Sequence, residues 1–394
     1  MGDLTSFGGD PAIVATRAEI ERVQRELAAV ANLLHSQVQP FDFLVKPGKH
    51  LALSLELPPV LQRIDFLYSA CSAAAEDYFL GEAKVAGGLA QSTAGAVAAT
   101  MLVAGAAFGV FRDQPGVRVS QVGTPEPVNP SDSLAQLMAR LRSTASVDGR
   151  IRVESFLIAA PNGATSSSAV SAQPTAQKFV VYLPGTQSWN MVPGANPIDF
   201  TSNLVGMANI RPTSSELAVS AALAAAGAKA NDQVLLVGHS QGGLVAANLA
   251  TRNNLNYKIA GIVTFGSPIG QLASQIKVPT LAIEHRNDVV PKLDLQRNPL
   301  TTNWVTVQRT VTGTAPGVQV DITQAHSLAE YQTTAAQADN SRDIGLSRVR
   351  GRILEFLKGP SGQVKTFEIS RAPLEQAQNL ENSTSKERHD AHDD

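Results

Sequence analysis

One short stretch constrains the fold of this chain more than any other feature. Its residues are Gly238, His239, Ser240, Gln241 and Gly242. The apolar run Val234–Val237 precedes it and the Ala-rich run Gln241–Arg252 follows it, which predicts a strand, a tight turn and a helix. Glycines let backbone segments approach such a turn closely, and the helix N-terminus adds positive potential that favours an oxyanion. The stretch therefore predicts Ser240 as a nucleophile raised above a sheet.

Short apolar runs alternate with helix-like runs between residues 148 and 358. The predicted strands are Ile151–Ile158, Phe179–Leu183, Val234–Val237, Ile259–Phe265, Thr280–Glu284 and Trp304–Gln308. The predicted helices are Ser214–Ala228, Gln241–Arg252, Leu328–Ala336 and Ser341–Lys358. This alternation predicts an α/β fold with a mostly parallel sheet.

The remaining chain divides into three further segments by pattern. We expect a helical hairpin with an Ala/Gly-rich apolar helix over 1–112, and a Pro-rich linker with a short helix, Ser131 to Ser143, over 113–147. A C-terminal extension with a polar, disordered tail is expected over 359–394. The α/β catalytic domain then covers 148–358.

Composition excludes several classes of protein. With 43% hydrophobic and 17% charged residues, the chain of 394 residues can bury a sizeable core. Its net charge of −2 gives no basic surface, so we expect no nucleic-acid partner. The single cysteine, Cys71, excludes an intrachain disulfide and a cysteine-based zinc site, and such scarcity is compatible with a bacterial chain. Without a phosphate-binding glycine loop or a cluster with metal-ligand spacing, we expect neither cofactor nor metal.

A serine nucleophile needs a base and an acid, which follow it along the chain in the order acid, then histidine. Of the seven histidines, only His285 and His326 follow the serine outside the polar tail. His285 lies in a strand-end run where the acid is expected, whereas His326 lies in a loop before a helix. We therefore expect His326 as the general base and Asp288 as the acid, with Glu284 and Asp294 as rivals. The alternative role for Asp288 is a loop cap that binds local backbone amides.

An oxyanion formed at the serine needs two hydrogen-bond donors. The first is expected to be the backbone N–H of Gln241, the residue after the nucleophile. The second is expected to be the backbone N–H of Thr186, with its hydroxyl assisting, in the turn after Phe179–Leu183. An ordinary Pro-Gly turn is the alternative interpretation of that segment.

Residues 188–212 form a long apolar-rich insertion between the oxyanion strand and the next helix. We expect Trp189, Met191 and Phe200 from this insertion, together with Val290, to contact the substrate. The hypothesis is that the insertion acts as a lid or an acyl-chain wall, and the alternative is an ordinary packed connection.

Taken together, these motifs resemble those of α/β-hydrolases, and among them class 3 lipases most. The matching runs are Leu183–Thr186, Gly238–Gly243, Thr264–Gly270, Asn287–Pro291 and Ala325–Tyr331. The resemblance implies a Ser240–Asp288–His326 triad that cleaves a small-molecule or lipid ester without a cofactor. Gln241 stands where class 3 lipases usually carry leucine, which puts the lipid specificity in question. An acyltransferase or a thioesterase on the same triad remains an alternative.

The N-terminal part suggests a separate role. Residues 10–84 read as two amphipathic helices, and Ala74–Glu82 resembles the Tyr-x-x-x-Asp/Glu signal of type VII secretion substrates, without their Trp-x-Gly turn. The weakly apolar stretch 85–111 predicts either a buried helix or a membrane contact. We expect no cleavable signal peptide, and so a cytoplasmic protein or one exported by a type VII-like route. A secreted or membrane-associated interaction protein, whose hairpin binds a protein partner, is the alternative function.

Overall fold

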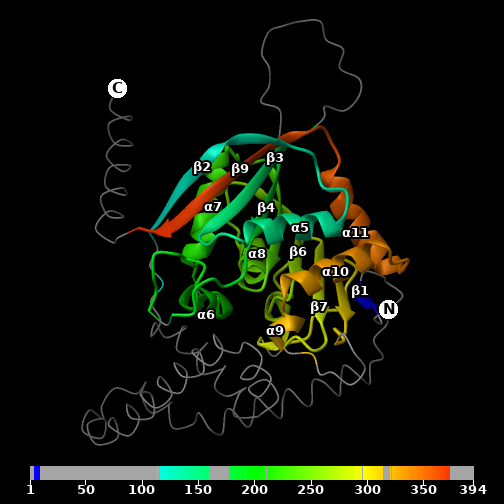
Figure 1. The fold of residues 1–394 in the computed structure, drawn as a ribbon. Coiled ribbons are helices and arrows are strands. Elements are labelled where there is room, and N and C mark those ends of the chain that lie inside the picture. The colour runs from blue at the N-terminus through cyan, green and yellow to red at the C-terminus, as the bar shows by residue number, and fades with distance from the viewer. Residues whose placement is uncertain are drawn as a thin grey trace, which may run out of the picture. The chain divides into compact units, whose positions relative to one another are not determined.

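The computed structural model describes residues 4–8, 113, 116–158, 177–190, 192–209, 211–294, 296–313, 320 and 322–372. A single nine-stranded sheet runs through this part of the chain, with the strand order β1-β8-β7-β6-β5-β4-β3-β9-β2 (Figure 1). The strands are β1 Thr5–Gly8, β2 Val117–Val128, β3 Arg150–Leu157, β4 Gln177–Leu183, β5 Gln233–His239, β6 Lys258–Phe265, β7 Thr280–His285, β8 Trp304–Arg309 and β9 Gly362–Arg371.

The centre of the sheet is parallel and its margins are antiparallel. Strands β4 to β8 pair in parallel with one another. Strands β1, β3, β9 and β2 pair in the antiparallel sense at the two sides. The predicted α/β fold with a mostly parallel sheet is therefore confirmed.

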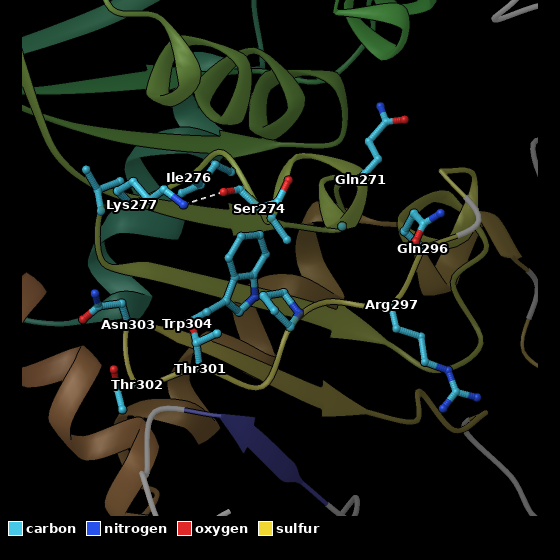
Figure 2. A pocket seen from close by; sticks show the side chains of 14 residues that line it. Gln271, Ser274, Ile276, Lys277, Gln296, Arg297, Thr301, Thr302, Asn303 and Trp304 are labelled. Carbon is cyan, nitrogen blue, oxygen red and sulfur yellow. Dashed lines mark hydrogen bonds between the residues drawn. The ribbon is translucent and has the colours of Figure 1, made fainter. Parts of the chain in front are cut away.

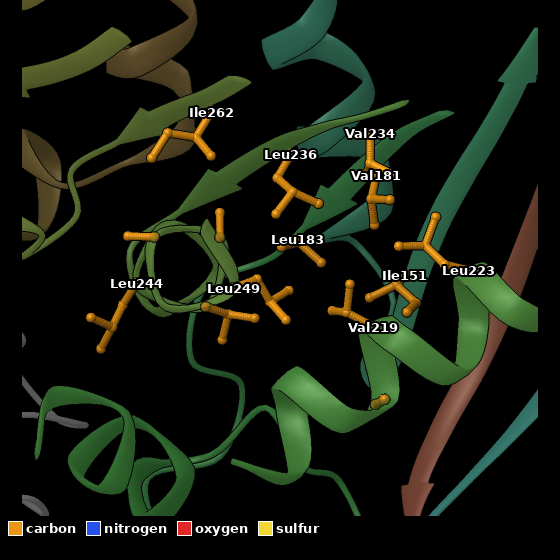
Figure 3. Close-up of a cluster of buried hydrophobic side chains, with 14 of the residues drawn as sticks. Ile151, Val181, Leu183, Val219, Leu223, Val234, Leu236, Leu244, Leu249 and Ile262 are labelled. Carbon is orange, nitrogen blue, oxygen red and sulfur yellow. The ribbon is translucent and has the colours of Figure 1, made fainter. Parts of the chain in front are cut away.

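Helices cover both faces of the sheet (Figure 1). They are α5 Leu134–Thr144, α6 Phe200–Ala208, α7 Ser214–Ala226, α8 Gln241–Thr251, α9 Ile322–Ala325, α10 Leu328–Asp339 and α11 Ile344–Leu357, with short 3-10 turns η2 Gly270–Leu272 and η3 Val290–Lys292. One buried cluster joins the sheet to α7 and α8 (Figure 3), and a second joins the other face to α5, α10 and α11.

The central strands read as continuous apolar runs because both of their faces are buried. In β5, Val234 and Leu236 pack in the first cluster, whereas Leu235 and Val237 pack in the second. This alternation follows from the two-residue period of a strand, and burial on both sides is typical of parallel sheets. It explains why these strands could be located from the sequence.

Three strands lie outside the segment expected to form the domain. The sequence predicts a linker over 113–147, but Val117–Val128 forms β2, which pairs with β9. Residues 359–394 are predicted as an extension, but Gly362–Arg371 forms β9 between β3 and β2. At the opposite edge, Thr5–Gly8 forms β1 and pairs with β8. The sheet therefore extends beyond the predicted boundaries of 148 and 358.

The predictions for the N-terminal hairpin, for the Tyr-x-x-x-Asp/Glu motif in Ala74–Glu82 and for the apolar stretch 85–111 lie outside the described residues. Among the helices that the structure does describe, none is long and apolar enough to cross a membrane.

Candidate active site

Ser240 occupies a strained turn between β5 and α8. Its backbone φ of 52° and ψ of −123° lie in a region that residues other than glycine rarely adopt. A Cβ on Gly238 would lie 2.3 Å from the carbonyl oxygen of Gly242, and one on Gly242 would lie 2.0 Å from the oxygen of Leu183. Both flanking positions therefore require glycine, because any side chain would collide with the backbone.

The loop after β4 contacts this turn. A Cβ on Gly185 would lie 2.9 Å from the Cβ of Ser240, so the loop backbone passes directly beside the serine. In the next residue, Thr186, the buried Oγ1 has no hydrogen-bond partner among the described residues. Gln241 opens α8, so its N–H lacks the carbonyl that a residue deeper in a helix would bind. Both expected oxyanion donors thus belong to segments next to Ser240.

His326 binds the carboxylate of Asp288. Its Nδ1 lies 2.7 Å from Oδ2 of Asp288, and the hydroxyl of Tyr331 donates to the same oxygen at 2.6 Å. The backbone N–H of Val290 donates to Oδ1 at 2.9 Å. A carboxylate only accepts hydrogen bonds, so Nδ1 of His326 is the donor in this bond.

The Asp288 carboxylate is completely buried. Burial alone would raise its pKa, but the neighbouring His326 and the hydrogen bonds from His326, Tyr331 and Val290 together lower its pKa below the usual value. These contacts therefore favour a negatively charged Asp288 carboxylate next to Nδ1 of His326.

Two more histidines lie around this pair. Nε2 of His239 donates to the backbone carbonyl of His326 at 3.0 Å, and the two rings are 4.5 Å apart. His285 stacks on Tyr331 at 3.9 Å, and its Nδ1 donates to the carbonyl of Ala325 at 2.5 Å. Burial lowers the pKa of His239 to about 3 and that of His285 to about 4. Both rings are therefore neutral near neutral pH and add no positive charge beside His326.

The two rival acids have other partners. Glu284 accepts hydrogen bonds from the side-chain amides of Asn298 and Gln308, and burial raises its pKa to about 7. Asp294 accepts from backbone N–H groups at 3.1 and 3.2 Å. Of the three candidate acids, Asp288 is the one that binds His326. Asp288 also accepts a hydrogen bond from the local N–H of Val290, as a loop cap would.

The residues expected at the substrate fall in different places. Trp189 and Phe200 lie together at the start of α6, with ring centroids 6.0 Å apart. Val290 is buried, and its backbone N–H donates a hydrogen bond to Asp288. Met191 lies outside the described residues. The insertion itself contains α6, most of whose residues are buried.

Several residues of the site were not singled out from the sequence. Tyr331 appeared only as the last residue of a matching run, although its hydroxyl binds Asp288 directly. Asp113, Asp199 and Arg371 form a buried ionic cluster at the N-terminal end of α6. The only sequence signal for Asp199 is its position before an apolar run, which is typical of a helix N-cap, the position it takes in α6.

A separate cavity of about 760 Å³ lies beside Trp304 (Figure 2). Its walls come from the β6–β7 and β7–β8 connections and include Gln271, Lys277 and Arg297. None of the residues expected at the site line it. Among the described residues, no group of histidine, cysteine and acidic side chains could hold a metal ion.

Comparison with known proteins gives one result for part of the chain. The family model described as the PGAP1-like alpha/beta domain matches residues 216–342, which include Ser240, Asp288 and His326. No curated protein and no solved structure matches the chain. The match does not single out class 3 lipases. Because the PGAP1-like domain belongs to the α/β-hydrolase superfamily, the comparison and the fold together indicate an α/β-hydrolase-like protein.

Proposed function

We propose that this protein is a serine hydrolase that cleaves carboxylic esters through an acyl-enzyme intermediate. The observation that carries the proposal is the 2.7 Å hydrogen bond between Nδ1 of His326 and Asp288. His239, which precedes Ser240 in the strained turn, binds the backbone carbonyl of His326. A buried acid, an oriented imidazole and a serine beside a helix N-terminus are the parts that acyl transfer needs.

In the proposed reaction, the Ser240 oxygen attacks the ester carbonyl while Nε2 of His326 takes the serine proton. Asp288 stabilises the resulting imidazolium, which then gives its proton to the departing alcohol. A water molecule attacks the acyl-enzyme by the same route, and the carboxylic acid leaves as Ser240 regains its proton. The N–H groups of Gln241 and Thr186 are proposed to hold the oxyanion, with the unpaired hydroxyl of Thr186 as a further donor.

The test is ester hydrolysis by wild type and Ser240→Ala over a series of acyl chain lengths, with fluorophosphonate labelling. We expect the variant to lose several orders of magnitude in rate and all labelling while it unfolds at the same temperature. Ser220→Ala is the matched control, because Ser220 lies on α7 and its hydroxyl binds that of Tyr257 rather than any residue of the site. Unchanged hydrolysis in Ser240→Ala would refute the proposal.

The aromatic pair at the start of α6 is proposed to contact the acyl chain, together with Met191 and Val290. Trp189 and Phe200 offer the apolar surface that a lid or acyl-chain wall requires. We expect Trp189→Ala and Phe200→Ala to reduce kcat/KM for long-chain esters by about tenfold, while acetate esters change little. Equal losses for short and long chains would count against an acyl-chain wall.

The same experiments distinguish the acyltransferase and thioesterase alternatives. Added alcohol acceptors that divert the acyl group into new esters would indicate transfer, and a preference for thioesters over esters of equal chain length would indicate a thioesterase. Partner capture by residues 1–112 alone, without any esterase activity in the full chain, would favour the interaction protein.

A further inference from the structure

A buried arginine at the end of β9 binds two carboxylates from distant parts of the chain. Nη1 of Arg371 lies 2.7 Å from Oδ2 of Asp199, and Nη2 lies 2.8 Å from Oδ1 of Asp113. Nη2 also donates to Oδ1 of Asp199 at 2.9 Å, so the guanidinium grips both oxygens of that residue. Burial opposes the positive charge, but the bonds to Asp199 and Asp113 outweigh it and raise the pKa of Arg371.

Asp199 connects this cluster to the turn after the nucleophile. Its backbone carbonyl accepts a hydrogen bond from Nε2 of Gln241 at 3.1 Å. Its side chain caps α6 through the N–H of Ser202 at 2.9 Å. Gln241 is 1% exposed, so this side-chain bond is made away from water. A leucine at position 241 could not donate it, which gives a structural role to the residue that departs from the lipase pattern.

The residues on either side of Asp199, Ile198 and Phe200, form hydrogen bonds with the loop that contains Thr186. The carbonyl of Ile198 accepts from the N–H groups of Gln187 at 2.9 Å and Ser188 at 3.3 Å, and the N–H of Phe200 donates to Ser188 at 2.8 Å. Gln187 and Ser188 directly follow Thr186. The short strip 198–200 is therefore bonded both to the loop of Thr186 and, through Asp199, to Gln241.

We propose that Arg371 is a positioning residue for the oxyanion hole, which it aligns through Asp199. This inference rests on the proposed function. A buried ion pair is weak evidence for stability in itself, since desolvation offsets much of its attraction. Its position is more informative, because it fixes a strip that is hydrogen-bonded to both segments that carry the expected donors. Oxyanion donors act only when they are aimed at the developing charge, so a small displacement of this strip would slow catalysis.

The direct test is Asp199→Asn, which keeps an N-cap side chain and the carbonyl that Gln241 binds but weakens the bond to Arg371. We expect kcat for a p-nitrophenyl ester to fall about tenfold or more, with KM changing less than about twofold. Inhibition by a trifluoromethyl ketone, which forms an oxyanion on the serine, should weaken by a similar factor. Gln241→Met should produce the same pattern by removing the side-chain bond.

Glu154→Gln is the matched control. Glu154 is as completely buried as Asp199 and is held by Arg140 and Arg152, but these belong to α5 and β3. We expect this variant to lose stability with kcat and ketone inhibition unchanged. If Glu154→Gln lowered kcat as much as Asp199→Asn, the effect would be general destabilisation and the inference would be overturned.

Hydrogen exchange gives a readout that does not need activity. In Asp199→Asn, amides of 185–190 and 199–206 should exchange about tenfold faster than in wild type, while those of β5 stay protected. An active wild type with unchanged kcat and unchanged exchange in the variant would overturn the positioning role alone. An inactive wild type that fluorophosphonate does not label would overturn the proposed function, and with it this inference.

Discussion

At the scale of single residues, the site depends on how one carboxylate oxygen is shared. Oδ2 of Asp288 accepts from both His326 and Tyr331, while Oδ1 accepts from the backbone. The Tyr331 hydroxyl thereby stabilises the charge of Asp288 in a place where burial opposes it. Tyr331 is itself held by stacking on the neutral His285. These contacts predict that the tyrosine affects the pH range of activity more than substrate binding.

Removing that hydroxyl gives the first prediction. In Tyr331→Phe the pKa of Asp288 should rise, because a donor to its charged form is lost. The acid limb of the pH–kcat/KM profile should therefore move to higher pH, and the free energy of unfolding should fall by about 1–3 kcal/mol. Tyr182→Phe is the matched control, since its buried hydroxyl binds the carboxylate of Glu154 at 3.1 Å. An equal shift of the acid limb in both variants would contradict the specific role of Tyr331.

At the scale of elements, α6 is attached along one face of α8. Gln241 and Asn248 lie seven positions apart on α8, and their side chains donate to the carbonyls of Asp199 and Gly206 at 3.1 and 2.9 Å. A Cβ on Gly206 would lie 3.3 Å from Nδ2 of Asn248, so the helices approach closely there. α6 is therefore packed against α8, and separating the two helices would break both amide contacts.

Asn248→Ala tests this attachment. The variant removes the 2.9 Å side-chain donor from the Gly206 carbonyl, which keeps only the 3.2 Å bond from the backbone N–H of Asn209. The free energy of unfolding should therefore fall by about 1–2 kcal/mol, and the amides of α6 should exchange faster. Asn340→Ala is the control, because that side chain also donates to a helical carbonyl at 2.9 Å but does so on the surface of α10. If Asn340→Ala lost as much stability as Asn248→Ala, burial of the hydrogen bond would not be the cause of the loss.

The elements also show what can be predicted from a sequence and what cannot. The central strands and the Ser240 turn were found because their signals are local: apolar runs buried on both faces, and glycines that backbone contacts require. Strand β2 was missed because it carries Pro125 and Pro127, is mostly exposed, and shifts register against β9 between Val122 and Glu126. Arg371 was missed because its partners Asp199 and Asp113 lie 172 and 258 positions away, a relation that no local pattern records.

At the scale of the whole molecule, stability should depend on pH through buried groups of opposite kinds. Burial lowers the pKa values of His239 and His285 to about 3 and 4. As the pH falls below about 6.5, these two side chains become protonated in the unfolded chain but stay neutral in the folded chain. Their contribution to stability is complete above that pH and is lost as the pH falls to about 4 for His285 and about 3 for His239. Glu284, with a pKa raised to about 7, acts in the opposite sense: its contribution is complete below about pH 4.5 and is lost as the pH rises toward 7.

Substitutions at the adjacent residues Glu284 and His285 should therefore change the acid dependence of the free energy of unfolding in opposite directions. Between pH 7 and pH 5, His285→Gln should lose less stability than wild type, by roughly 1–2 kcal/mol, since each such histidine costs at most about 1.4 kcal/mol per pH unit. Glu284→Gln should lose more stability than wild type over the same range. Urea denaturation at both pH values measures these differences, and a parallel decline in all three proteins would rule out this account.

The order of the strands has a consequence for how this protein can be dissected. β9 lies between β3 and β2, and β1 covers the outer edge of β8. A fragment cut to residues 148–358, which the sequence suggests as the domain, would lack all three of β1, β2 and β9. It would leave open hydrogen-bonding edges on β8 and β3, and such edges recruit strands from other molecules. Attempts to express that fragment alone should yield oligomers or aggregates, and a peptide spanning Thr5–Gly8 would serve only one of the two exposed edges.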